Sequence, residues 1–333
     1  MKKQEINILN VFFCIMVIFI HASGAVVSGP EDSLAYMGIF PIWNLFSVAV
    51  PGFIFLSGLK SGLNQEEFTF KSYGVYVANK FKKIYFPYVL WVILYYLWFI
   101  SQGYFPFSVS ELVKYILNGT LAAHFYFVII IMQFYMLFPV VKRVVKRFSP
   151  ALILLSSLII SYFSEKYLSI VIYDITKVNF IYTDRLFTTY LVYYAFGLIC
   201  AQNYEKVLNT GKNKWLIAFC ALLAIVFCVS FRTPYYQISK LMFCLNIIPC
   251  LLAFSSKIST DGFFKSKFFK CVNSATFNIY LSHLLFMQII DTYIISAISG
   301  RLLVAFCIRL LLLLLLSFLY SYFKKHLRRR NEI

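Results

Sequence analysis

Long apolar runs separated by short polar links fill almost all of the 333-residue chain. A helix that crosses a membrane needs about 20 mostly apolar residues. Ten runs reach or approach this length, at residues 6–27, 37–59, 84–101, 124–141, 151–164, 186–202, 215–231, 240–256, 272–291 and 302–323. We therefore predict an all-α integral membrane protein, a polytopic bundle of about ten transmembrane helices that forms a single domain over residues 1–333.

Composition and charge support this prediction. Hydrophobic residues make up 61% of the chain and charged residues only 13%, too few to cover a soluble domain of this size. The net charge is +18, and 23 of the 31 lysines and arginines lie at the termini and in the even-numbered links, against 7 in the odd-numbered links. This alternation predicts cytoplasmic N- and C-termini. It also makes anionic membrane lipids the expected neighbours and argues against nucleic acid.

The first apolar run carries a stripe of polar residues. Read as a helix, it places Asn7, Asn10, Cys14 and His21 on one narrow face, because steps of three, four and seven residues return to nearly the same angle. Ionisable groups inside a membrane are costly and usually functional. The stripe is typical of a membrane enzyme or transporter, although His21 alone would also suit a structural hydrogen bond to a neighbouring helix.

Other polar residues fall at a similar depth in the predicted spans: His124, Gln133, His283 and Arg309. Buried polar groups need partners or water, so we expect them to converge in one cavity of the outer leaflet. Structural alternatives are an interfacial aromatic-belt position for His124 and snorkelling or ion pairing for Arg309.

Motifs of soluble enzymes are missing from the sequence. It has no phosphate-binding glycine loop, zinc-binding histidine helix or serine elbow, and its eight cysteines lack metal-ligand spacing. We therefore expect no metal site, and an enzyme built on this chain would use histidine as its general base.

Four motifs and two shorter stretches point to a known family. They are Ile20-His21, Lys80-Phe-Lys-Lys83-Ile-Tyr-Phe-Pro87, His124-Phe-Tyr-Phe127 through Gln133-Phe-Tyr135 to Pro139, Phe277-Asn-Ile-Tyr-Leu-Ser-His283, Tyr194-Ala-Phe-Gly-Leu198 and Asn203-Tyr-Glu-Lys206. In their order and spacing the chain resembles the acyltransferase family 3 of integral membrane O-acyltransferases. It looks closest to the branch that modifies or exports the intercellular-adhesion polysaccharide of Gram-positive bacteria.

The resemblance implies a reaction and a place in the cell. An acetyl or succinyl group would pass from a cytoplasmic donor, with acetyl-CoA or another acyl-CoA as co-substrate and no bound cofactor, to a hydroxyl of a glycan or lipid-linked glycan. The protein would lie in the bacterial cell membrane, and a polysaccharide synthase is a further candidate partner. His21 matches the family's first-span histidine and would act as general base or as acyl carrier.

The supporting residues match the family less closely. Asn10 stands where the family usually has an arginine, and it cannot replace that charge toward an anionic donor. Lys80 and Lys83 match positions that are often arginine. Two other functions therefore stay open: a polysaccharide exporter of the same fold, which would tolerate loss of His21, and a family member that has lost activity.

Overall fold

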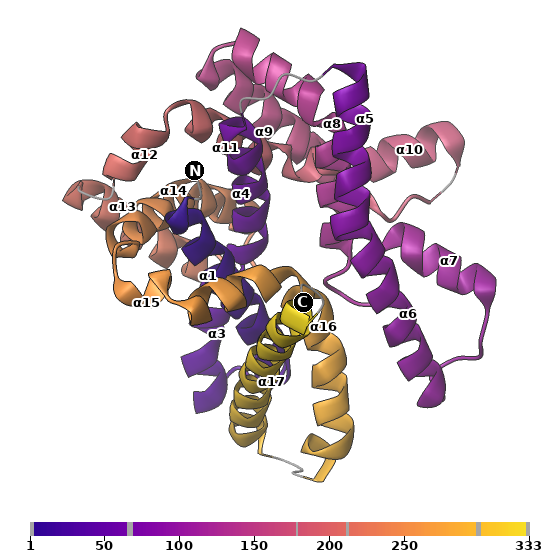
Figure 1. Ribbon diagram of the computed structural model, residues 1–333. Helices are drawn as coiled ribbons and strands as arrows, with labels where there is room; N and C mark the ends of the chain where they lie inside the picture. The colour runs from indigo at the N-terminus through magenta and orange to yellow at the C-terminus, as the bar shows by residue number, and fades with distance from the viewer. Residues whose placement is uncertain (1–2, 65–68, 178, 211–212, 298–300, 331–333) are drawn as a thin grey trace. The chain divides into compact units, whose positions relative to one another are not determined.

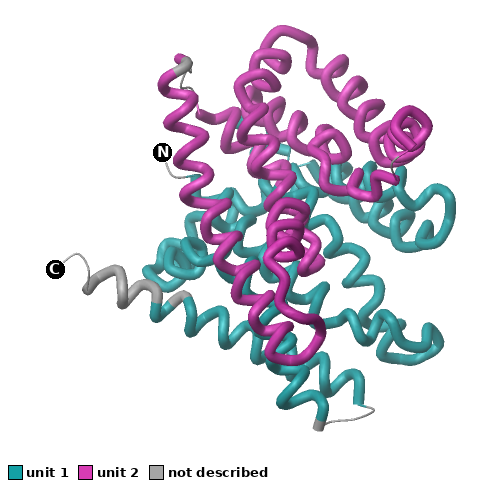
Figure 2. The backbone as a smooth tube through the Cα atoms, turned by 90° about the vertical axis from the view of Figure 1, so that its right-hand side faces the viewer, with its two compact units in different colours: residues 1–53, 204–333 teal, residues 54–203 magenta. Residues whose placement is uncertain are grey.

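The computed structural model is all-helical wherever it describes the chain (Figure 1). The described residues are 3–64, 69–177, 179–210, 213–297 and 301–330. Their contacts divide the chain into two compact units, unit 1 with residues 1–53 and 204–333 and unit 2 with residues 54–203 (Figure 2). The prediction of one functional domain over the whole chain stays a prediction.

Unit 1 is built from both ends of the chain. It contains α1 (Gln4–Ala22), α2 (Gly24–Val27), α3 (Leu34–Phe46), the start of α4 (Ala49–Leu63), α12 (Tyr204–Thr210), α13 (Lys214–Val229), α14 (Tyr236–Ile258), α15 (Gly262–Lys265), α16 (Lys267–Tyr293), η4 (Ile295–Ala297) and α17 (Leu302–Arg330). Its first and last segments pack together: the Tyr204 hydroxyl donates to the buried Glu5 carboxylate at 2.5 Å.

Unit 2 holds the middle of the chain. It contains the rest of α4, α5 (Phe70–Lys80), η1 (Phe81–Tyr85), α6 (Phe86–Ser101), α7 (Val109–Asn118), α8 (Tyr126–Arg147), α9 (Pro150–Lys166), α10 (Leu168–Thr176), η2 (Thr183–Arg185), η3 (Phe187–Tyr190) and α11 (Leu191–Gln202). Much of its core is aromatic, as in the stacked rings of Phe134 and Tyr194, whose centroids lie 4.2 Å apart.

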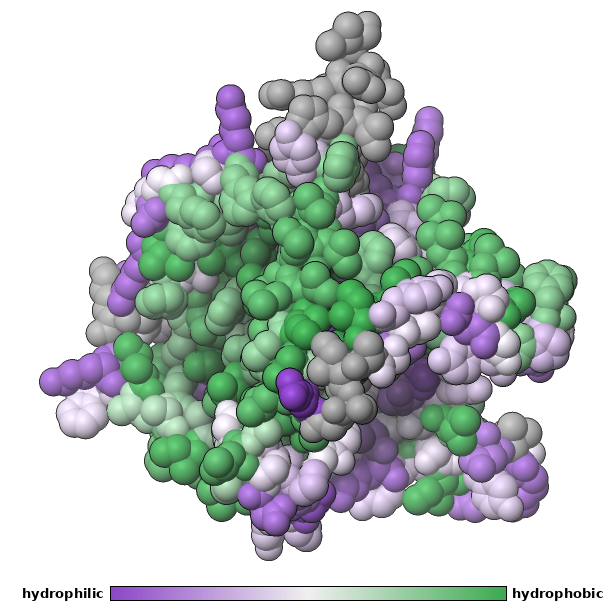
Figure 3. All heavy atoms as spheres, turned by 90° about the horizontal axis from the view of Figure 1, so that it is seen from below, coloured by the Kyte–Doolittle hydropathy of each residue, from purple (hydrophilic) through white to green (hydrophobic). Residues whose placement is uncertain are grey.

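Every predicted apolar run coincides with a helix, and the chain is a multi-pass membrane protein. Among the residues that the structure describes, six spans are long and apolar enough to cross a membrane: Gln4–Ala22, Leu34–Leu63, Lys71–Ser101, Tyr126–Arg147, Tyr236–Ile258 and Leu302–Tyr320. Two bent helix pairs, α9 with α10 and α12 with α13, raise the number to eight. Hydrophobic side chains cover much of the face in Figure 3, with hydrophilic ones toward its edges. Ten spans stay a prediction, because α11 and α16 are not among the helices that are long and apolar enough to cross a membrane. The cytoplasmic location of the termini also stays a prediction.

Proline explains the irregular turn in the third predicted span. Residues 81–85 form a π-helical turn between α5 and α6, directly before Pro87 at the start of α6. Proline has no N–H, and its ring clashes with the carbonyl of the preceding turn. One wide turn removes the clash without ending the helix. The turn displays the Lys82 and Lys83 side chains on the surface.

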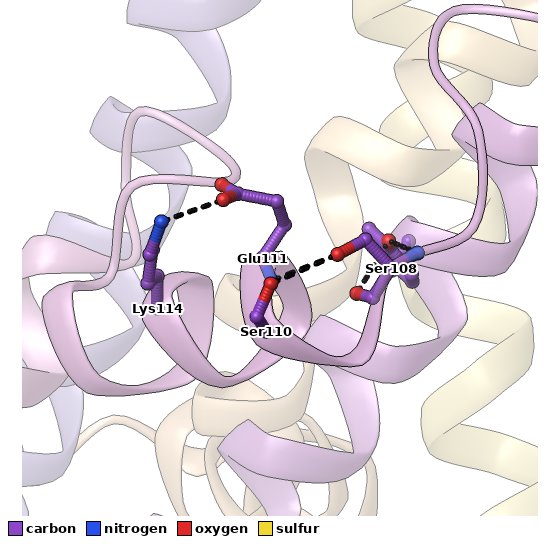
Figure 4. A network of polar contacts seen from close by, with 5 residues as sticks. Ser108, Ser110, Glu111 and Lys114 are labelled. Atoms are coloured by element: carbon purple, nitrogen blue, oxygen red, sulfur yellow. Dashed lines mark hydrogen bonds and ion pairs between the residues drawn. The ribbon is translucent and has the colours of Figure 1, made fainter.

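The link between α6 and α8 is ordered by α7 (Figure 4). The Ser108 hydroxyl caps this helix by accepting from the Glu111 N–H, and Lys114 pairs with Glu111 at 2.7 Å. The Tyr96 hydroxyl donates to the Ser108 carbonyl at 2.9 Å and accepts from its N–H at 2.7 Å. These contacts fasten the start of α7 to α6.

Helices α4 and α11 approach each other backbone to backbone in unit 2. A Cβ at Gly197 would lie 2.8 Å from the Leu59 nitrogen, and a Cβ at Gly58 would lie 3.0 Å from the Tyr194 carbonyl carbon. Such distances leave no room for even a methyl group. Small residues are what allow this close packing of helices in a membrane.

We expect Gly58→Ala and Gly197→Ala each to destabilise unit 2, because the added methyl group forces α4 and α11 apart. Overpacking typically costs about 1–3 kcal/mol. The measurement is the thermal unfolding midpoint of the detergent-solubilised protein. Gly74→Ala in α5 is the matched control, since a Cβ there meets nothing within 4 Å. Equal midpoints for Gly197→Ala and Gly74→Ala would contradict the close approach.

Candidate active site

Helices α1 and α16 run parallel in unit 1 and bring two histidines together. The Cys14 thiol donates to the Thr276 carbonyl at 3.6 Å, and the ring centroids of His21 and His283 lie 5.1 Å apart. His21 follows Cys14 by seven residues on α1, and His283 follows Thr276 by seven residues on α16. Seven residues correspond to two helical turns, or about 10.5 Å along the axis. Equal steps on both helices mean that they stay in register between the two contacts.

The His283 ring is fixed by its own helix. It is fully buried, and its Nδ1 lies 2.6 Å from the Tyr280 carbonyl oxygen. A carbonyl only accepts hydrogen bonds, so Nδ1 carries the hydrogen and Nε2 of the neutral ring keeps its lone pair. His21, in contrast, is only half-buried. The pair therefore combines an oriented, enclosed ring with a more accessible one.

The turns of α1 and α16 that precede the two histidines are packed in an apolar cluster. Phe19, on α1, packs edge-on against Phe306 at 5.4 Å and Phe46 at 5.0 Å. Ile18 and Ile279, about one turn before the two histidines, belong to the same buried cluster.

Arg309 forms an ion pair that joins α17 to α16. Its Nε lies 2.6 Å from Asp291 Oδ1, and the two side chains are 12% and 28% exposed. The sequence left two structural alternatives open for Arg309, snorkelling and ion pairing, and the structure shows an ion pair. Asp291 was not among the predicted site residues, although it is the acidic residue at that end of α16. It follows His283 by eight residues, about 12 Å along the helix axis.

Asn10 lies on α1, half-buried and eleven residues before His21, which corresponds to about 16 Å along the axis. A side chain of this length does not span that separation. A role for Asn10 would therefore concern a distant part of an extended donor, and this role stays a prediction.

In unit 2, the two predicted lysines differ in their surroundings. Lys80 Nζ lies 3.8 Å from the centre of the Tyr135 ring and 5.2 Å from that of Tyr76, so both aromatic faces attract its charge. Lys83 is exposed in the π-helical turn η1. Lys83 is thus the more accessible of the two for an anionic ligand.

Gln133 binds backbone with both ends of its amide. Its Nε2 donates to the Arg185 carbonyl at 2.7 Å, and its Oε1 accepts from the Phe187 N–H at 2.9 Å. These bonds hold the two 3-10 turns that precede α11. The predicted sixth span consequently starts its α-helix at Leu191 rather than at residue 186. The contacts give Gln133 a structural role in unit 2.

His124 is buried in an aromatic cluster at the start of α8. Its ring centroid lies 4.3 Å from that of Phe125 and 5.9 Å from that of Tyr95. An interfacial aromatic-belt position and a role in chemistry both stay predictions for His124.

The predicted site residues are divided between the units. Unit 1 holds Asn10, His21, His283 and Arg309, and unit 2 holds Lys80, Lys83, His124 and Gln133. Within unit 1 the structure brings His21 and His283 together. Tyr280 was not among the predicted site residues, because it orients His283 through its backbone carbonyl, a contact that any residue type could make. Convergence of His21, His124, Gln133, His283 and Arg309 in one cavity stays a prediction.

The amino-acid sequence is similar to a known protein family and to individual known proteins. A family model described as an acyltransferase domain, acyltransferase family 3, matches residues 3–323. A probable poly-beta-1,6-N-acetyl-D-glucosamine export protein of Staphylococcus epidermidis is 24% identical over 310 residues, covering 88% of this chain and 84% of that protein. The protein of that name from Staphylococcus aureus strain MSSA476 is 23% identical, covering 88% and 85%. No solved structure matches the chain significantly.

We expect Arg309→Gln and Asp291→Asn each to destabilise unit 1 by about 1–3 kcal/mol, because each leaves a partly buried charge without its partner. The double variant Arg309→Gln/Asp291→Asn should recover part of this loss. The measurement is the thermal midpoint in detergent for the four proteins, compared as a double-mutant cycle. Strictly additive effects of the two substitutions would show that the pair contributes nothing to holding α17 on α16.

Proposed function

Since the chain belongs to the acyltransferase family 3 of integral membrane proteins, we propose that it is an O-acyltransferase that modifies a polysaccharide. The acyl group, acetyl or succinyl, comes from a cytoplasmic acyl-CoA, and the acceptor is a hydroxyl of a cell-surface or exported glycan. Relatives named for a poly-N-acetylglucosamine support a glycan as acceptor. The observation that carries the proposal is the pairing of His21 with His283.

In the proposed reaction, neutral His21 takes the proton of the acceptor hydroxyl as its oxygen attacks the thioester carbonyl. The new ester C–O bond forms, the C–S bond breaks, and the leaving CoA thiolate receives the proton from His21. The enclosed His283 ring packs beside His21 and limits the orientations open to it. This makes His283 a positioning residue.

A covalent route uses the same histidine. Here a His21 nitrogen attacks the thioester, CoA leaves as the thiol, and the glycan hydroxyl then removes the acyl group from the imidazole. This route lets donor and acceptor react in turn, so they need not occupy the site together. Both routes require an imidazole at residue 21.

The donor is anionic, and the two lysines of unit 2 are its proposed contacts. Lys83 is exposed, while Lys80 is attracted to the Tyr76 and Tyr135 rings. Asn10 adds no charge where the family usually has arginine. Binding of CoA phosphates therefore falls to the lysines in this proposal, with both termini on the cytoplasmic side of the bacterial cell membrane.

Export is the second candidate function, and the names of the two staphylococcal relatives favour it. An exporter needs a continuous polar passage for a sugar chain and has no need of an imidazole at residue 21. The two functions thus differ in what they require of His21. A polysaccharide synthase would be a partner in either case.

We expect His21→Ala to abolish polysaccharide O-acylation while polymer still reaches the surface. Loss of a general base lowers the rate by roughly 100- to 10,000-fold. The measurement is the O-acyl content of surface polysaccharide in strains with the wild-type protein, His21→Ala or no protein, with membrane levels of the protein determined alongside.

Three outcomes separate the alternatives. Polymer that stays at the surface but lacks O-acyl groups in both altered strains supports the enzyme and places His21 in its site. Polymer that accumulates inside the strain without the protein, with His21→Ala behaving like wild type, would establish export instead. Identical O-acyl content and surface polymer in all three strains would show that the chain has lost the activity.

We expect Lys83→Gln to raise the KM for acyl-CoA several-fold in membrane vesicles, with kcat less affected, because a charge that only binds the donor acts on both ground and transition states. Lys82→Gln is the matched control, an equally exposed lysine of the same turn. The same KM change for both variants would reduce the role of Lys83 to general surface charge.

A further inference from the structure

Unit 1 contains an apolar groove of about 440 Å³. Its walls come from α1, α14, α16 and α17, together with the short α15, and include Ile8, Ile18, Phe254, Phe268, Ile279 and Phe318. The size falls within the range of small-molecule sites. None of the residues assigned to acyl transfer lines it.

The lining offers little to a polar ligand. Ser255, Thr276 and Ser317 carry its hydroxyl groups, among the described residues that line it. The Thr276 hydroxyl donates to the Asn273 carbonyl of its own helix at 2.9 Å. The amides of a pantetheine arm would lose their hydrogen bonds to water here without replacement, at a cost of several kcal/mol. A hydrocarbon chain has no such groups to satisfy.

One end of the groove is rich in exposed lysines. Lys257, Lys265, Lys267 and Lys270 each neighbour a lining residue in the sequence, and all four side chains are exposed. The acidic residue of this segment, Asp261, caps α15 by accepting from the Phe263 N–H at 2.8 Å. The excess of positive charge suits an anionic headgroup.

The groove has the length of one lipid leaflet. Its lining on α1 extends from Ile8 to Ile18, about 15 Å at 1.5 Å per residue, and on α16 from Phe268 to Ile279, about 16 Å. Half of the roughly 30 Å hydrocarbon core of a bilayer is about 15 Å. A single acyl chain that enters at the lysines would therefore reach the far end.

We propose that this groove binds one acyl chain of an anionic phospholipid, with the headgroup at Lys265, Lys267 and Lys270. The far end lies about one helical turn before His21 and His283, as judged from Ile18 and Ile279. A bound chain therefore fills the space beneath the histidine pair and keeps water from reaching it from that side. The proposal holds for an acyltransferase and for an exporter alike.

The test uses the full-length protein in phosphatidylcholine vesicles that contain a minor fraction of phosphatidylglycerol with a photoactivatable group in its acyl chain. After illumination, mass spectrometry maps the labelled peptides. We expect labelling concentrated in residues 8–18 and 268–279. Phosphatidylcholine with the same photoactivatable chain should label these residues far less.

Two variants make the test specific. Lys267→Gln/Lys270→Gln should lower groove labelling by phosphatidylglycerol roughly 30-fold, since each lysine near an anionic headgroup contributes on the order of fivefold. Lys206→Gln/Lys214→Gln removes the same charge from exposed lysines of unit 1 that neighbour no lining residue. Val11→Phe narrows the groove without changing charge and should also lower labelling.

Three results would overturn the proposal. Labelling spread evenly over lipid-facing helices such as α13 would mean that the groove has no preference for lipid. Equal loss in the two double-lysine variants would attribute binding to overall charge. Protection of the groove by acyl-CoA, or by a second copy of the chain in crosslinked dimers, would identify a different occupant.

Discussion

In hydrocarbon every backbone N–H and C=O must find a hydrogen-bond partner within the protein, and this requirement shapes the chain from end to end. It makes all regular structure in the described residues helical. Irregular backbone survives where something else satisfies it. Pro87 is accommodated by a single π-helical turn, and the 3-10 turns before α11 are bonded by the side-chain amide of Gln133.

The same requirement governs the polar side chains of unit 1. His283 uses one ring nitrogen on the Tyr280 carbonyl, and Arg309 uses its charge on Asp291. The ion pair holds α17 on α16, and the hydrogen bond fixes the orientation of the His283 ring. In the proposed reaction, contact with the substrate falls to the more accessible member of the histidine pair, His21.

The sequence predicted the helices well because apolar runs and basic links are one-dimensional signals. The polar stripe on the first run was also informative, since Cys14 and His21 share a face and both meet α16. The sequence also placed His21 and His283 at a similar depth, but the direct contact of their two rings depends on the register of two helices far apart in the chain, which no sequence pattern shows. Tyr280 contacts His283 through its backbone carbonyl, which every residue has. Lys80 contacts the face of a tyrosine ring, and the chain has many tyrosines. Neither contact therefore has a distinct sequence pattern.

The apolar groove limits how an acyl donor reaches His21. A CoA thioester carries amides and phosphates, and a groove lined almost wholly by hydrocarbon would leave those amides without partners. The polar arm of the proposed donor would therefore need another approach to the histidine pair. A lipid chain in the groove would strengthen this constraint, because it would exclude water from the part of unit 1 that the groove occupies, before His21. A polar path to His21 through that part would then cost more free energy.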